Sequence, residues 1–166
     1  MTEPLDDQVR ELLAIGELVD VRFLSFRADL RGELREDIKP DELESSMQVQ
    51  VGRQPGVLEI RIDFDAITTA ADYSVVAATQ FHFDEEQPEV SEELGRAFAE
   101  KVGVMAVYPY VREALQSMSM RLRQDAITLP LLRAGGVSLT NPQPYGEAGP
   151  SASANAIGPD SSELEN

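Results

Sequence analysis

The residues best suited to chemistry gather in one short acidic run. His82 is followed by Asp84, Glu85 and Glu86, and imidazole and carboxylate groups are common ligands of divalent metals. Side chains alternate along a strand, so His82 and Asp84 would point to one face and Glu85 to the other. The chain has no second His. We therefore expect a solvated acidic turn here and no metal site.

Two other features could belong to an enzyme. Asp63 and Asp65 share one face of a predicted strand and could form an acid/base pair, but Arg61 on the same face favours a solvated outer surface. Gly135-Gly136 is followed by no Lys and lacks the strand–turn–helix frame of a phosphate loop. No nucleophile with its base is recognisable. We predict that the chain is not an enzyme and binds no cofactor.

Composition limits the partners of the 166-residue chain, whose length suits a single domain. Against 14 Lys and Arg stand 30 Asp and Glu, a formal charge of −16. That charge repels nucleic acid and anionic membrane surfaces, so neither is expected as a partner. Without Cys there are no disulfides and no Cys-based zinc site. Neither a signal peptide nor a membrane-spanning run is recognisable, which predicts a cytoplasmic protein without membrane insertion.

The first half of the chain has the period-two alternation of β-strands. Residues 18–30 form the first predicted strand, and their apolar phase changes at Phe23 and Leu24, which indicates a bulge or a strand covered on both faces. Three further alternating segments follow at 47–51, 58–64 and 73–83. Residues 32–46 are charged and contain Pro40, which is typical of a long exposed connection. We expect these four strands to form an antiparallel meander.

The second half has the apolar spacing of helices. Ser91 is a good N-cap, and the apolar residues from Leu94 to Met105 form one stripe. Pro109 suits the first turn of a new helix, whose apolar stripe extends to Leu122. We therefore predict an α+β fold: a four-stranded antiparallel meander sheet with a Pro-broken helical pair packed on one face. A short amphipathic helix or a turn in 9–18 is also expected.

The C-terminal part is different in composition. Residues 141–166 are rich in Pro, Gly and Ser, contain no Lys or Arg, and carry too few large apolar side chains to offset the entropy of ordering. We expect an N-terminal segment 1–16, one domain over 17–140 and a disordered acidic tail over 141–166. Within the domain, the apolar residues of 107–118 and of 118–132 form either core or an adaptable binding surface, because Met and Leu serve both purposes.

One motif resembles a known family. Tyr108-Pro109-Tyr110-Val111-Arg112-Glu113 resembles the Phe-Pro-Tyr-x-Arg-Glu signature of the SecB-like protein-export chaperone family. Residues 129–132 fall where that family has a Pro/Leu-rich strap, and residues 32–46 fall where it has a crossover loop. The resemblance covers residues 17–140, and its motif residues are Tyr108, Pro109, Tyr110, Arg112 and Glu113.

The resemblance implies an ATP-independent chaperone that holds unfolded polypeptides, a preprotein or an antitoxin, in apolar grooves. It also implies a homotetramer built as a dimer of dimers, with no nucleotide or other cofactor. The client-binding residues expected beside the motif are Leu24, Phe26, Met118, Met120, Leu122, Leu129, Leu131 and Leu132.

Departures from the family pattern bear on the client. Where export-dedicated members have acidic contacts for the translocase motor, this chain has Phe23, Arg27 and Val76, and it lacks the Cys that the family's zinc-binding tail needs. These differences argue against coupling to the motor, and the Tyr-Pro-Tyr form of the motif favours the branch that guards an antitoxin. The alternative is a small α+β enzyme or ligand-binding protein with a helix on a curved sheet, which a closed pocket with converging polar groups would favour.

Overall fold

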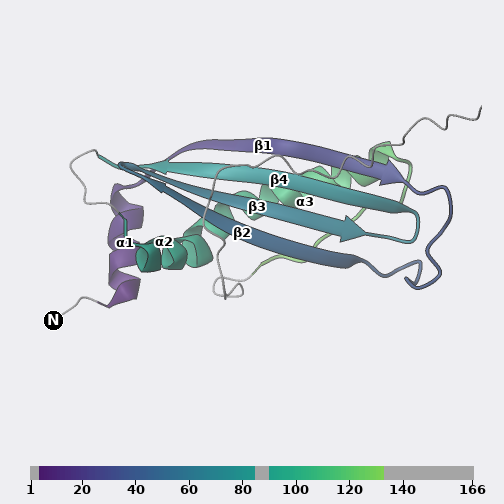
Figure 1. The fold of residues 1–166 in the computed structure, drawn as a ribbon, viewed down its shortest axis with the longest axis horizontal. Helices are drawn as coiled ribbons and strands as arrows, with labels where there is room; N and C mark the ends of the chain where they lie inside the picture. Colours follow the sequence, from purple (N-terminus) through teal and green to yellow (C-terminus); the bar gives the residue numbers. More distant parts are fainter. Residues whose placement is uncertain (1–3, 85–89, 133–166) are drawn as a thin grey trace, which may run out of the picture.

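The computed structural model of the chain describes residues 4–84 and 90–132. Four long strands lie side by side and α3 runs along one face of their sheet, while α1 and α2 lie together at one end (Figure 1). The elements, in chain order, are α1 (Leu5–Ile15), β1 (Glu17–Leu30), β2 (Glu44–Gln54), β3 (Val57–Ile67), β4 (Ala71–His82), α2 (Glu92–Phe98), the π-helical turn η1 (Ala99–Gly103) and α3 (Val104–Arg121). This is the α+β architecture that the sequence predicts.

The strand order corrects one expectation. The sheet has the order β1-β4-β3-β2 with every pair antiparallel, so only β2, β3 and β4 form a meander. The connection after β1 crosses to the far edge of the sheet, where β2 begins. Two hydrogen bonds hold this connection against the β3–β4 turn, from Arg31 N to Ala70 O and from Arg35 N to Thr69 O. Ile38 anchors it further, since its side chain is buried.

Of the two interpretations of the phase change in β1, the structure has the bulge. The register between β1 and β4 shifts twice, between Leu18 and Asp20 and between Phe23 and Ser25. Because each extra residue reverses the alternation, Phe23 and Phe26 both face the helix side of the sheet, opposite Ala77 and Val75 of β4. The change of apolar phase in the sequence is therefore the trace of a bulge.

The core lies between the sheet and the helices. Alternate residues of β3 supply its floor, and Leu58, Ile60 and Ile62 are fully buried. The ring of Phe98 packs edge-on against Phe81, with 4.9 Å between the ring centroids. α3 packs mainly on β4 and β3 and makes fewer contacts with β1. The edge strand β1 is therefore only partly covered.

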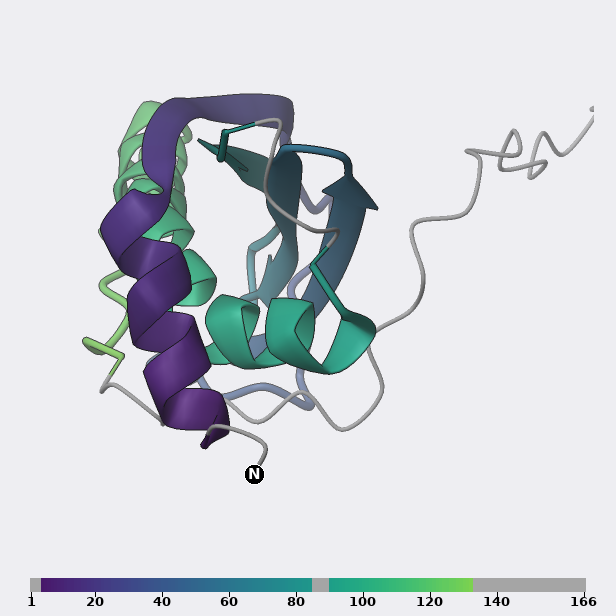
Figure 2. The same cartoon turned by 90° about the vertical axis from the view of Figure 1, so that its left-hand side faces the viewer.

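The helices follow the predicted start but not the predicted break. Ser91 caps α2 by accepting a hydrogen bond from Leu94 N at 3.2 Å, as expected. The break expected at Pro109 is wrong, because α3 continues through this residue. Pro109 has no N–H, so the carbonyl of Met105, four residues earlier, receives no hydrogen bond within the helix. Both residues are exposed, and water can donate to that carbonyl instead. The helical chain changes direction earlier, at η1 (Figure 2).

Several expectations concern residues outside the described part of the chain. These are the tail 141–166, the glycine pair Gly135-Gly136, and the acidic residues Glu85 and Glu86.

Candidate polypeptide-binding surface

The residues that could do chemistry form ordinary surface contacts in the described part of the chain. Within residues 4–84 and 90–132 no group of three or more His, Cys, Asp or Glu could hold a metal ion. Arg61 donates two hydrogen bonds to the Asp63 carboxylate, at 2.7 and 3.1 Å. Asp65 and His82 are exposed. The two Asp residues thus belong to a charged outer sheet face.

The helix side of β1 exposes large apolar side chains. Phe26 and Leu30 are 54% and 55% exposed, although they lie opposite Val75 and Ala71, which are fully buried on the same face. Leu18, opposite Phe81, is also exposed. Exposed apolar area that is contiguous is uncommon in proteins that act alone and marks sites of interaction. We call Leu18, Phe23, Phe26 and Leu30 the β1 strip.

Aromatic contacts connect the β1 strip to α3. The rings of Phe23 and Phe26 have centroids 4.4 Å apart, and Phe23 meets Tyr110 edge-on at 6.4 Å. Tyr110 is itself 44% exposed. The second tyrosine of the Tyr-Pro-Tyr motif therefore extends the apolar surface from the strand to the helix.

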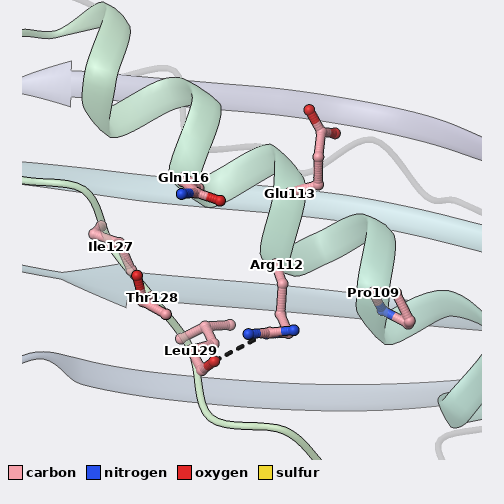
Figure 3. A pocket seen from close by; sticks show the side chains of 7 residues that line it. All are labelled: Pro109, Arg112, Glu113, Gln116, Ile127, Thr128 and Leu129. Atoms are coloured by element: carbon pink, nitrogen blue, oxygen red, sulfur yellow. Dashed lines mark hydrogen bonds between the residues drawn. The ribbon is translucent and has the colours of Figure 1, made fainter.

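A second apolar region lies where the chain returns along α3. We call residues 126–132 the strap. Three side chains of α3 bond to the strap backbone: Tyr108 OH donates to Pro130 O at 3.0 Å, Arg112 Nε donates to Leu129 O at 2.9 Å, and Ser119 Oγ accepts from Ile127 N at 3.1 Å. Figure 3 shows Arg112 reaching from the helix to the strap.

Part of the contact between α3 and the strap is shielded from solvent. Ile127 and Leu129 are buried, and burial raises the pKa of Tyr108 despite the opposing charge of Arg112. A small pocket of about 150 Å³ remains between the two segments, lined on the helix by Pro109, Arg112, Glu113 and Gln116 (Figure 3). The strap is therefore held by side chain–backbone bonds and two buried side chains.

The client-binding residues expected from the sequence lie on β1, near the end of α3 and in the strap. On β1, Leu24 and Phe26 are exposed. The others lie at the end of α3, in the turn after it and in the strap, where Met120 and Leu131 are exposed and Leu129 is buried. Met118, Leu122 and Leu132 are partly buried against the core.

Some residues of this surface escaped the sequence analysis. Leu18 and Leu30 contribute exposed apolar area but were not among the expected client-binding residues, and Tyr110 was expected only as a residue of the family motif. Alternation along β1 shows which residues share a face, but it does not show that the strand is an edge. Only the pairing of β1 with β4 explains why this face is left open.

Comparison with known proteins decides the family. No protein-family model matches the chain. The SecB-like chaperone SmegB of Mycolicibacterium smegmatis is 38% identical over 137 residues, which span 82% of this chain and 89% of that protein. This chain belongs to the SecB-like chaperones. The family resemblance of the Tyr-Pro-Tyr motif is thereby confirmed, and so is the chaperone function that it implies.

The structure agrees with this assignment of a SecB-like chaperone. The SecB-like chaperone Rv1957 of Mycobacterium tuberculosis, solved in complex with a ChAD peptide from the Rv1956 HigA1 antitoxin, has a similar fold. The TM-score is 0.65 at 23% identity, and the match covers 76% of this chain and 97% of that one.

Among the described residues, no helix combines the length and apolar character needed to cross a membrane.

Proposed function

We propose that this SecB-like chaperone holds extended, non-native polypeptide on the β1 strip and its continuation at Tyr110. The observation that carries the proposal is the exposure of Phe26 and Leu30, although their partners on β4, Val75 and Ala71, are fully buried. An apolar strip of this kind binds by displacing water, which is non-directional and therefore tolerant of client sequence. Many weak contacts along an extended chain supply the affinity, and no nucleotide is needed.

The charge of the chain suits this activity. A formal charge of −16 keeps particles with exposed apolar area apart and attracts basic segments of a client. The outer face of the sheet carries part of this charge, as with Asp63 and Asp65. Apolar binding and electrostatic repulsion are thus placed on different faces of one sheet.

We further propose that the client is an antitoxin-like polypeptide, because the fold neighbour Rv1957 was solved with an antitoxin peptide. The protein would act in the cytoplasm as a homotetramer and would catalyse no reaction. Two surface pockets of the described residues measure about 150 and 260 Å³, and each is smaller than the ~300–1,000 Å³ of usual small-molecule sites.

The proposal is tested by suppression of aggregation without ATP. Wild-type protein should keep a diluted, chemically denatured client soluble, and Phe26→Asp should raise the concentration needed about tenfold, because a charge would be carried into the apolar contact. Ser25→Asp is the matched control, since Ser25 is the adjacent residue on the opposite face. The proposal fails if wild-type protein does not suppress aggregation, or if the two variants lose activity equally.

A further inference from the structure

Side chains of α3 hold the strap by its main chain. Tyr108, Arg112 and Ser119 lie on one stripe of α3, since spacings of four and seven residues return to nearly the same side of a helix. Each uses its side chain to bond a main-chain atom of the strap. Main-chain atoms are common to all polypeptides, so these contacts do not depend on the sequence of the bound segment.

The burial of the strap follows the same logic. Ile127 and Leu129 point into the protein and are buried, whereas Thr128 and Pro130 between and after them are exposed. No helix or strand is formed in the strap. Alternate apolar residues that are seated on an apolar surface, with main-chain bonds to fixed side chains, describe an extended polypeptide in a binding site.

We propose that this stripe of α3 is a second polypeptide-binding site and that the strap is its resident occupant. The ligand class is an extended segment with apolar residues at alternate positions, which displaces the strap when a client binds. The inference rests on the proposed chaperone function and deepens it. Tyr108 and Arg112, two residues of the family motif, act here as binding residues for main-chain carbonyls.

The covalent connection makes the strap a selective competitor. A segment tethered by a short linker has an effective concentration on the order of mM at its own site. A short free peptide competes poorly against such an occupant. A long client that is already held on the β1 strip is tethered in its turn and can displace the strap. The site would therefore favour long unfolded chains over short peptides.

The first test loosens the occupant and leaves the site intact. The double variant Ile127→Ser/Leu129→Ser should bind a fluorescent copy of the strap, Ala-Ile-Thr-Leu-Pro-Leu-Leu, about tenfold tighter than wild-type protein, because its own strap competes less. Adding Tyr108→Phe and Arg112→Gln to that variant should reverse the gain about tenfold, because two hydrogen bonds to the peptide are lost. If the strap only packs against α3 and occupies no binding site, the Ile127→Ser/Leu129→Ser variant should bind the peptide no tighter than wild-type protein.

Matched controls keep this test specific. Ala126→Ser changes an exposed residue of the same strap, and Arg121→Gln removes an exposed charge from the same helix; neither should change peptide binding more than about twofold, because neither side chain takes part in the contact. A peptide with Ser in place of the Ile and of the first Leu should not bind. A folded double variant that binds the strap copy no better than wild type overturns the inference.

The second test uses unaltered protein and separates the two proposals. Hydrogen exchange at the Ile127 amide, which bonds to Ser119 Oγ, should be at least about tenfold faster when wild-type protein is saturated with denatured client, because the strap is displaced. If wild type suppresses aggregation but this amide stays protected in the complex, the second site is wrong and the proposed function stands. If wild type does not suppress aggregation, the proposed function itself fails.

Discussion

Two leucines of the strap have the same side chain and opposite surroundings. Leu129 is 3% exposed and Leu131 is 78% exposed. Both belong to the set of client-binding residues expected from the sequence, which does not distinguish them. Their difference allows packing and client binding to be separated at the scale of single residues.

We predict that Leu129→Asp lowers the free energy of unfolding by about 3–5 kcal/mol, because a charge without a partner would be buried. Leu131→Asp should change it by less than about 0.5 kcal/mol. Urea unfolding of both variants measures the difference. Equal losses of stability would mean that the strap does not pack on α3 as described.

A second prediction at this scale concerns acid. The guanidinium of Arg35 bonds the Asp37 carboxylate and lowers the pKa of Asp37 from 3.8 to about 2. A pKa that is lower in the folded state stabilises the fold above pH ~4, and this contribution is lost as the pH falls towards about 2. The urea midpoint of wild type should exceed that of Asp37→Asn at neutral pH, and the gap should close between pH 4 and pH 2.

Asp41→Asn serves as the control for this measurement, because Asp41 is exposed in the same connection between β1 and β2. A gap between wild type and Asp37→Asn that stays constant down to pH 2 would contradict the assignment of the effect to Arg35. The contribution is small, since both side chains are partly in water and solvent screens the pair.

At the scale of elements, the π-helical turn η1 depends on one glycine. A Cβ at Gly103 would lie 2.6 Å from Ile60 Cγ1, and Ile60 is fully buried in β3. Replacing Gly by Ala within an ordinary helix stabilises it by about 0.5–1 kcal/mol. Because η1 approaches β3 so closely, we expect the same replacement at Gly103 to lower the stability of the protein.

Gly103→Ala should therefore destabilise the protein by about 1–3 kcal/mol, because the extra methyl overpacks the core. Thermal unfolding followed by circular dichroism measures the change. Gly32→Ala is the control, since no atom lies within 4 Å of its added Cβ. If Gly103→Ala were more stable than wild type, the close packing of η1 against Ile60 of β3 would be contradicted.

The sequence could predict the elements better than their connections. Alternation located all four strands, and the change of phase at Phe23-Leu24 indicated the bulge in β1. The pairing of β1 with β4 could not be predicted, because it depends on contacts between residues far apart in the chain. The helix break was placed at Pro109 from a local rule, whereas the bend at η1 fits the tight packing of Gly103 on Ile60.

The candidate site was predictable only in part for the same reason. Apolar residues on β1 and near the motif were expected to bind clients, and Phe26 is exposed as such a role requires. An apolar edge strand and an apolar central strand have the same alternation, so exposure itself cannot be inferred from the pattern. Tyr108, Arg112 and Ser119 share one face of α3, but nothing in the sequence indicates that they bond main-chain atoms of the strap, and sequence reasoning missed these bonds.

At the scale of the whole molecule, the exposed apolar residues predict self-association. Outside the proposed client-binding surface, Leu13 and Ile15 are exposed on α1 and Met105 on α3. Burying such residues against other copies is favourable by about 25 cal/mol for each Å² removed from water. If the proposed homotetramer forms, light scattering at micromolar concentration should give the mass of four chains. A strict monomer at all concentrations would contradict the proposed tetramer.

The strand order also bears on how the protein is made. The strand that pairs with β1 is β4, with Leu30 opposite Ala71 and Glu17 opposite His82. Because translation proceeds from the N-terminus at about 5–20 residues per second, β1 is synthesised seconds before the strand that completes it. During that interval the nascent chain presents an apolar strand with unpaired main-chain groups. A finished copy of the chaperone would meet in it a substrate of the kind it holds, and so each new molecule would be a client of those already made.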